Sequence, residues 1–176
     1  MGKVQISLEC EQMKSPIEGA TAKNIRKYES YKLALEMIED GIANKCPLQS
    51  IAIEESIMSD RLWSALNASK EKGEKHETLG KALKAWGTLK ERGLATPFDA
   101  EAESMYKELQ RWWDARSRLI HGIVKSFRGK GPQTTAAKFR QSAMKAAKSG
   151  KELARSVCNW SSKQIRKSRK ASKAKN

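Results

Sequence analysis

Apolar residues recur every three or four positions along most of this chain, which is the spacing of amphipathic helices. The pattern predicts helical segments at about 25–38, 48–68, 79–89, 98–127 and 134–169. The last of these is either one helix or two joined near Gly150. Before the first helix, Val4, Ile6 and Leu8 alternate with polar residues, which indicates a short strand or an extended arm.

Two local signals mark where elements begin and end. Thr96-Pro97-Phe98-Asp99 supplies an N-cap, a proline at the first helical position and an early acidic residue, so a helix is expected to begin there. Gly129-Lys130-Gly131-Pro132 interrupts the helical pattern. We therefore expect an all-α protein, a four- to five-helix bundle with a basic C-terminal helical extension. The expected divisions are an arm at 1–21, the bundle at 22–128, and the extension with its tail at 129–176.

Charge is distributed unevenly along the chain. The net charge is +15, and the pI is about 9.9. Residues 1–128 hold 21 Lys and Arg against 19 Asp and Glu, whereas residues 129–176 hold 14 against one. A basic block favours a polyanion, because each neutralised phosphate releases condensed counterions. Nucleic acid is the first expectation, with an anionic membrane surface or an acidic protein as alternatives. Deletion of residues 133–176 is expected to leave a folded core that binds nucleic acid less well.

The composition argues against several other classes of protein. Three widely spaced cysteines do not indicate a disulfide framework, and two histidines cannot complete a zinc-binding pattern. We therefore expect neither a metal nor another cofactor. No apolar leader or membrane-length apolar stretch is found, so the expected location is the cytoplasm and no membrane partner is expected.

Two charged residues interrupt apolar stripes. Arg116 falls near the middle of the apolar face of the fourth segment, and Glu55 falls on the apolar face of the second. An unpaired buried charge is costly, so the two are expected to form a partly buried pair. Such a pair is either a structural salt bridge or part of a functional cleft. The neighbouring Glu54 is expected on the polar side of its helix, and Trp112 is expected in the core.

The stretch from Arg116 to Gly122 (Arg-Ser-Arg-Leu-Ile-His-Gly) resembles the Arg-x4-His motif of the HEPN (higher eukaryotes and prokaryotes nucleotide-binding) domains. Residues 53–62 look like the second-helix region of the same family, and the resemblance covers roughly residues 22–128. It implies a helical bundle that is commonly a homodimer and, in many members, a metal-independent ribonuclease. Ser117 departs from the Asn, Asp or His that usually follows the motif's Arg.

The resemblance also implies roles for individual residues. Arg116 would stabilise the charge that develops on the scissile phosphate, and His121 would transfer a proton. Ser117 would orient either group, and Glu55 completes the candidate catalytic set. Lys125 and Arg128, one and two turns beyond His121, would guide the RNA backbone. Outside the resemblance, the positive charge of the last segment predicts further nucleic-acid-binding residues, which are Lys138, Arg140, Lys145, Lys148, Lys151 and Arg155.

The sequence leaves more than one function open. The favoured hypothesis is a metal-independent RNA endonuclease of toxin–antitoxin or antiphage-defence type, with RNA or DNA bound by the basic segment. One alternative is a non-catalytic nucleic-acid-binding or scaffold protein. Another is an adaptor whose basic helix binds an acidic protein such as an antitoxin.

Overall fold

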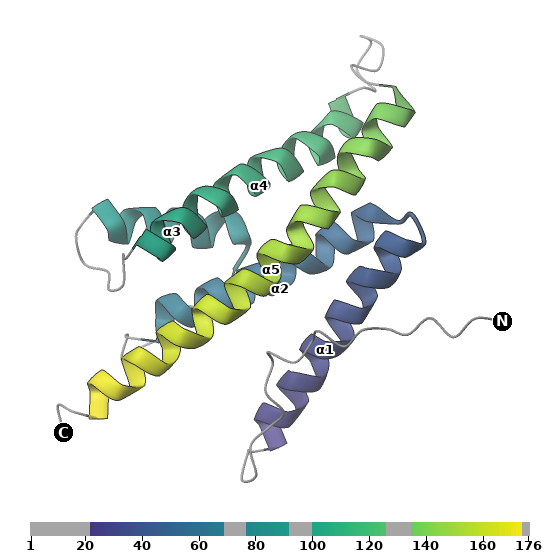
Figure 1. The fold of residues 1–176 in the computed structure, drawn as a ribbon. Coiled ribbons are helices and arrows are strands. Elements are labelled where there is room, and N and C mark those ends of the chain that lie inside the picture. The colour runs from purple at the N-terminus through teal and green to yellow at the C-terminus, as the bar shows by residue number, and fades with distance from the viewer. Residues whose placement is uncertain (1–21, 69–76, 92–99, 126–134, 174–176) are drawn as a thin grey trace.

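The structure is a computed structural model that describes residues 22–68, 77–91, 100–125 and 135–173. These residues form five helices and no strand, which confirms the all-α expectation (Figure 1). The helices are α1 (Ala22–Ala43), α2 (Pro47–Asn67), α3 (Leu79–Glu91), α4 (Ala100–Lys125) and α5 (Ala136–Lys173). None of them is both long enough and apolar enough to cross a membrane.

Three sequence expectations lie outside the described residues. They are the arm with its alternating apolar residues at 1–21, the helix start at 96–99 and the break at 129–132.

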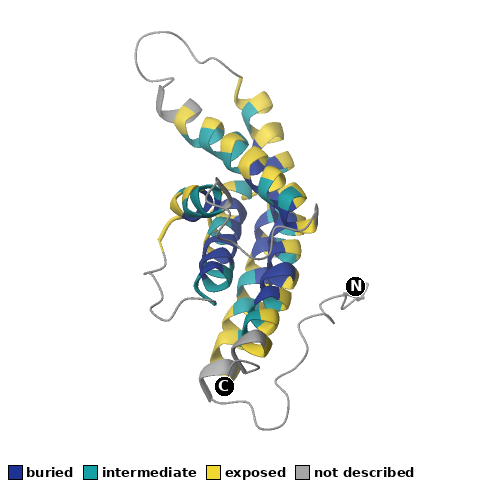
Figure 2. Cartoon of the chain, turned by 90° about the vertical axis from the view of Figure 1, so that its left-hand side faces the viewer, coloured by how far each residue is buried: buried dark blue, intermediate teal, exposed yellow. Residues whose placement is uncertain are grey.

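The central helix of the bundle is α2, which packs against α1, α3 and α5. Its buried residues lie on more than one face, because helices surround it on several sides. They are Ser50, Ile51, Glu54, Ile57, Met58, Ser59, Leu62, Trp63 and Leu66. Buried residues lie along the faces where the helices meet, and exposed residues cover the outside (Figure 2).

The longest helix, α5, is part of the core and not an extension. It is one continuous helix of 38 residues, without the break considered near Gly150, and its most extensive packing is against α2. Ala147, Val157 and Trp160 are among the α5 side chains buried in the core. The sequence boundary at residue 129 therefore does not divide core from extension. Deletion of residues 133–176 would remove one wall of the core, so the packing of α5 argues against the expectation that a folded bundle survives it.

Glu54 corrects a second expectation. Its side chain is fully buried, not on a polar face, because that side of α2 meets α5. At the crossing, a Cβ placed on Gly150 would lie only 2.7 Å from Cδ of Glu54 and 2.7 Å from Nε1 of Trp112. Only a glycine lets the two helices approach this closely around a carboxyl group. Neither oxygen of Glu54 has a hydrogen-bond partner among the described residues, and burial raises the pKa of this carboxyl to about 8.

A polar network ties α5 to α2 and α1 farther along. The guanidinium of Arg61 donates to the hydroxyl oxygens of Ser161 (2.9 Å) and Ser162 (2.6 Å) and lies 5.7 Å from the ring centroid of Tyr31. Tyr31 in turn donates its hydroxyl proton to Asp60. These contacts hold α5 in register along α2.

Aromatic packing joins α3 and α4 to α5. The ring of Trp86 stacks on that of Trp160 with centroids 4.8 Å apart, and its edge meets Tyr106 at 5.3 Å. Trp112 is buried, as expected, and donates its indole N–H to the carbonyl of Ala146 at 3.0 Å. The face of α4 that carries Trp112 is thereby fixed against α5, which sets the direction of Arg116 one turn later.

Candidate functional site

The pair expected between Glu55 and Arg116 is present. The guanidinium Nη2 of Arg116 on α4 lies 2.5 Å from Oε2 of Glu55 on α2. The two side chains are 24% and 16% exposed, so the pair is mostly shielded from water. A shielded pair of this kind links two helices, and removing either partner would leave the other charge poorly solvated.

Trp113 supports the arginine from one side. The guanidinium carbon lies 5.1 Å from the centroid of the Trp113 ring, within the range of a cation–π contact. That ring rests against Gly80 of α3, where an added Cβ would approach it to 2.8 Å. The Nε of Arg116 is buried and has no hydrogen-bond partner among the described residues. The guanidinium is therefore held by the carboxylate of Glu55 and the indole of Trp113, and its Nε–H donates no hydrogen bond among the described residues.

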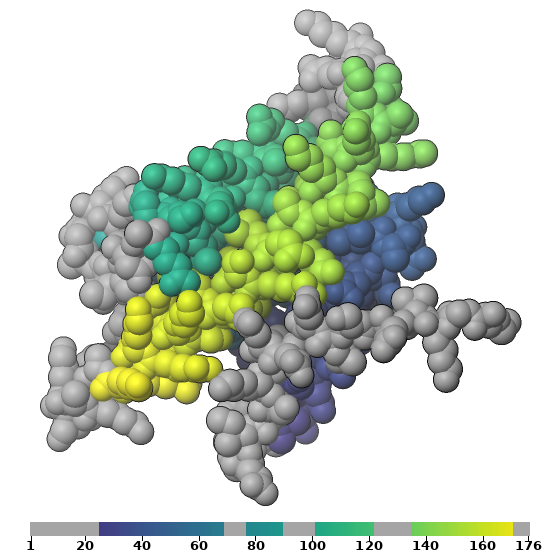
Figure 3. Space-filling model, in the orientation of Figure 1, coloured from purple at the N-terminus to yellow at the C-terminus, as the bar shows by residue number. Residues whose placement is uncertain are grey.

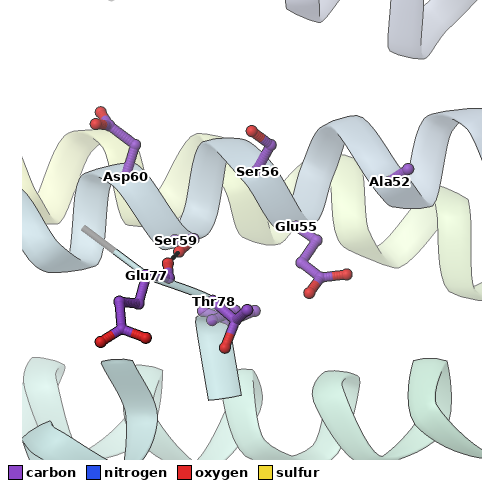
Figure 4. A pocket seen from close by; sticks show the side chains of 8 residues that line it. Ala52, Glu55, Ser56, Ser59, Asp60, Glu77 and Thr78 are labelled. Carbon is purple, nitrogen blue, oxygen red and sulfur yellow. Dashed lines mark hydrogen bonds between the residues drawn. The ribbon is translucent and has the colours of Figure 1, made fainter. Parts of the chain in front are cut away.

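A groove of about 510 Å³ lies beside this pair, between α2 and the start of α3 (Figure 4). Its acidic residues are Glu55, Asp60 and Glu77, and hydroxyl groups of Ser56, Ser59 and Thr78 also line it. Each carboxylate already has a cationic partner: Arg116 for Glu55, Lys27 for Asp60 at 3.0 Å, and Lys81 for Glu77. An acidic lining repels phosphate, so this groove does not suit a nucleic-acid backbone.

His121 lies on the same helix but outside the pair. It is exposed, five residues after Arg116 and therefore about 140° farther around α4. No contact joins it to Arg116, Ser117 or Glu55 within the described part of the chain. Ser117 is half-buried next to the pair. One molecule thus presents Arg116 and His121 on different faces of α4.

Two residues expected to guide RNA cannot be placed. Lys125 is the last residue of α4, but its side chain lies outside the described part of the structure, as does all of Arg128. The described residues also contain no group of three His, Cys, Asp or Glu side chains placed to hold a metal ion.

The solvent-facing side of α5 is strongly basic, and we call it the basic ridge. Its exposed cations without an acidic partner among the described residues are Lys138, Arg140, Lys145, Lys148, Arg166, Arg169 and Lys170. Figure 3 shows the atoms of α5, in yellow and green, running diagonally across one face of the molecule. The ridge lies opposite the face that packs on α2, because the apolar and basic positions of the helix occupy opposite sides.

Two of the predicted binding residues are half-buried and share an acidic partner. Lys151 and Arg155 both contact Oε1 of Glu39 on α1, at 2.8 and 3.0 Å. Their charges are therefore partly neutralised, and the middle of the ridge is less basic than its ends. Lys163, which was not among the expected nucleic-acid-binding residues, also has an acidic partner: its Nζ lies 2.9 Å from Oε1 of Glu101 on α4.

The C-terminal end of the ridge was absent from the predicted residues. Arg166, Arg169 and Lys170 are exposed on the last turns of α5. The charge count over residues 129–176 already pointed to them, since they belong to the same excess. The helical segment predicted at 134–169 already contained Arg166 and Arg169, but they were not named among the expected binding residues.

Comparison of the chain with protein-family models, curated proteins and solved structures found no match.

Proposed function

We propose that this protein binds nucleic acid, with RNA the favoured ligand and DNA a further one, through the basic ridge of α5. The observation that carries the proposal is the row of exposed cations, without acidic partners among the described residues, on a helix whose other face is buried in the core. The helix has 12 Lys and Arg against one Glu, and its 38 residues extend about 57 Å at about 1.5 Å per residue.

The rigidity of the ridge matters to binding. The opposite face of α5 is buried against α2, so the backbone that carries the cations does not need to be ordered when a ligand arrives. Phosphate contacts from Lys and Arg supply most of the affinity of non-specific binding. Two groups of unpaired cations, at the N-terminal and C-terminal ends of α5, would contact the backbone at separated points.

Charge removal tests this proposal. Lys145→Gln with Lys148→Gln, and Arg166→Gln with Lys170→Gln, each remove two exposed ridge charges. The control is Lys84→Gln with Arg111→Gln, two exposed cations on α3 and α4. Fluorescence anisotropy with a labelled RNA should show a loss of roughly tenfold or more for each ridge variant and little change for the control. Equal losses in all three variants, or none in the ridge variants, would reject the ridge as the binding surface.

A second candidate function is metal-independent RNA cleavage, which the HEPN-like motif implies. The observation that favours it is an arginine whose guanidinium is held in place by Glu55 and Trp113, with an exposed histidine five residues later on the same helix. Arg116 would stabilise the charge on the scissile phosphate, and His121 would remove the proton of the 2′-hydroxyl. Because the two side chains diverge around α4, a complete site would combine Arg116 of one copy with His121 of another.

Cleavage has its own test. Purified protein should cut single-stranded RNA in the presence of EDTA, leave a 2′,3′-cyclic phosphate, and bind but not cut DNA. His121→Ala should slow cleavage by about 10²- to 10⁴-fold without loss of RNA affinity. It should also relieve any toxicity of expression, and Ser117→Asn should raise activity. Tight RNA binding without cleavage of several RNAs would reject this candidate and leave the binding proposal intact.

A further inference from the structure

The cations of the basic ridge are gathered in two clusters, one near each end of α5. We call them the N-terminal cluster and the C-terminal cluster. The N-terminal cluster is Lys138, Arg140, Lys145 and Lys148, and the C-terminal cluster is Arg166, Arg169 and Lys170. Because the opposite face of α5 packs in the core, the spacing between the two clusters is set before any ligand binds.

The stretch between the clusters, residues 149–163, contributes little positive charge. Its three cations, Lys151, Arg155 and Lys163, each contact an acidic side chain on another helix. Glu152, the only acidic residue of α5, is exposed in the same stretch. The other exposed side chains of residues 149–162 are short and uncharged: Ser149, Ser156 and Asn159. A phosphate backbone that followed the whole ridge would therefore meet a carboxylate and paired cations at its middle.

The two clusters lie on the same side of α5, at a spacing close to one turn of a nucleic-acid duplex. Lys148 and Arg166 are 18 residues apart, which is about five helical turns, so they share one side of the helix about 27 Å apart. Lys145 and Lys170 are 25 residues apart, or about 37 Å, and differ by only about 20° around the helix axis. One turn of B-form duplex is about 34–36 Å, so a strand returns to the same side within this range.

The ridge lacks the aromatic surface that single strands use. Proteins that bind single strands without sequence preference combine a basic groove with aromatic side chains on which the bases stack. Every aromatic side chain that the structure describes is buried or half-buried. The aromatic residues of α5 are Phe139, which is half-buried, and Trp160, which is buried and stacks on Trp86. Among these residues, a single strand would find phosphate contacts but no exposed ring for its bases.

We propose that the basic ridge binds double-stranded nucleic acid, with α5 lying along the duplex, one cluster on the backbone at each end and the weakly charged middle mainly over the grooves. Double-strand binding rests on the proposed function and restricts its ligand to the duplex. Phosphate contacts carry no sequence information and are common to RNA and DNA, so duplexes of both kinds are ligands.

Duplex length tests the two-cluster geometry. The ligands are labelled RNA hairpins with stems of 8, 18 and 24 base pairs and the same four-nucleotide loop, measured by fluorescence anisotropy at one salt concentration. At about 3.4 Å per base pair or less, an 8-pair stem spans at most about 27 Å and cannot serve both whole clusters. Affinity should rise at least about tenfold from 8 to 18 pairs, and less than about threefold from 18 to 24, because 18 pairs already extend along most of α5.

Removal of one cluster checks the origin of this length dependence. Arg166→Gln with Arg169→Gln and Lys170→Gln should reduce the gain from 8 to 18 pairs to less than about threefold, since only one cluster then remains. The control removes the same charge from three other exposed positions, Lys32→Gln with Lys84→Gln and Arg111→Gln, and should keep the full gain. A control that loses the gain equally, or an affinity that rises evenly with stem length in the wild type, would overturn the proposal.

A single strand separates this proposal from nucleic-acid binding in general. An unstructured RNA of 24 nucleotides should bind at least about tenfold more weakly than the 18-pair stem, and a DNA hairpin with an 18-pair stem should bind within about tenfold of the RNA stem. A single strand that binds as tightly as the duplex would overturn double-strand binding and leave the proposed function in place. Absence of binding to all of these ligands would reject both.

Discussion

At the scale of single residues, Glu54 and Arg116 are both charged groups in low-polarity surroundings, and they are accommodated differently. Arg116 has Glu55 and the face of Trp113. Glu54 has no hydrogen-bond partner among the described residues and no water contact, so it is most stable as a neutral carboxylic acid. The two neighbouring glutamates of α2 therefore have different roles, one paired with an arginine and the other protonated in the core.

The first prediction is that Glu54 makes stability fall as the pH rises. The pKa of this carboxyl rises from 4.5 to about 8 on folding. Between these values the folded state keeps a proton that the unfolded state loses, so stability is greatest below pH 4.5 and declines up to about pH 8. The decline from this group is on the order of 5 kcal/mol.

Glu54→Gln removes the titration and should flatten this decline. Urea unfolding at several pH values should show the variant more stable than the wild type above pH 8 and similar to it near pH 5. Ser156→Ala, an exposed change on α5, is the control. Parallel pH profiles for wild type and Glu54→Gln would show that Glu54 is ionised in the folded protein.

The second prediction concerns Glu55 and Arg116. Glu55→Ala should destabilise by about 1–3 kcal/mol, because it leaves the mostly buried guanidinium without its carboxylate. The control is Glu108→Ala, a change at an exposed position of α4, which should lower the free energy of unfolding by less than about 0.5 kcal/mol. A double-mutant cycle with Arg116→Ala should give a coupling free energy of about 1 kcal/mol or more. Additive effects would mean that the pair does not tie α2 to α4.

These residues also show what helical periodicity can predict. Glu55 and Arg116 each interrupt an apolar stripe, and that mismatch alone was enough to pair them. The burial of Glu54 could not be found in this way. Glu54 is buried because α2 is the central helix of the bundle and α5 covers a second face of it. The apolar periodicity of α2 alone predicts that this face is polar and exposed. The glycine at position 150 of α5 was the available signal, since it marks a close helix crossing.

At the scale of elements, the packing of α2 on α5 is the most extensive of the bundle, and its closest approach depends on Gly150. A third prediction follows from its geometry. Alanine is normally better than glycine inside a helix by about 1 kcal/mol. Here Gly150→Ala should instead destabilise by about 2 kcal/mol or more, because the new methyl would overlap Glu54 and Trp112.

A compensating change checks the cause of this loss. Glu54→Ala removes the carboxyl that the new methyl would meet, so Glu54→Ala with Gly150→Ala should be more stable than the sum of the single changes predicts. Thermal unfolding measures all three variants. A stabilising Gly150→Ala would show that the helices are farther apart at this crossing.

The five helices themselves follow from the apolar periodicity, but the role of α5 does not follow from its charge. Its stripe, which includes Ala143, Ala146, Leu153, Val157 and Trp160, already indicated a buried face. The concentration of lysine and arginine suggested an appendage instead. The apolar stripe and the basic residues belong to one helix. Its apolar side completes the core, and its basic side faces solvent.

At the scale of the whole molecule, the same helix therefore carries both stability and the proposed binding surface. The fourth prediction separates the two by truncation. A chain that ends at residue 132 lacks α5 and should not fold, because α2 would expose Ile51, Met58 and Leu62 to water. A chain that ends at Ile165 keeps every buried residue of the α5 core and loses six cations.

The chain that ends at Ile165 should fold, but it should bind RNA more weakly than the full chain. Circular dichroism and thermal unfolding should show a helical, cooperatively unfolding protein for the chain ending at Ile165, with weaker RNA binding. The chain ending at residue 132 should show no cooperative transition. A folded protein without α5 would contradict the arrangement of the core.

The most direct test of nucleic-acid binding by α5 is the salt dependence of RNA binding. If the ridge neutralises about six phosphates, the plot of log K against log salt should have a slope of about −4 to −5, and affinity should fall by several hundred-fold or more over a fourfold rise in salt. The Lys145→Gln, Lys148→Gln variant should reduce the slope by about one to two, while the Lys84→Gln, Arg111→Gln control keeps the wild-type slope. A slope near zero for the wild type, or the same slope for the ridge variant and the wild type, would contradict binding of a phosphate backbone by α5.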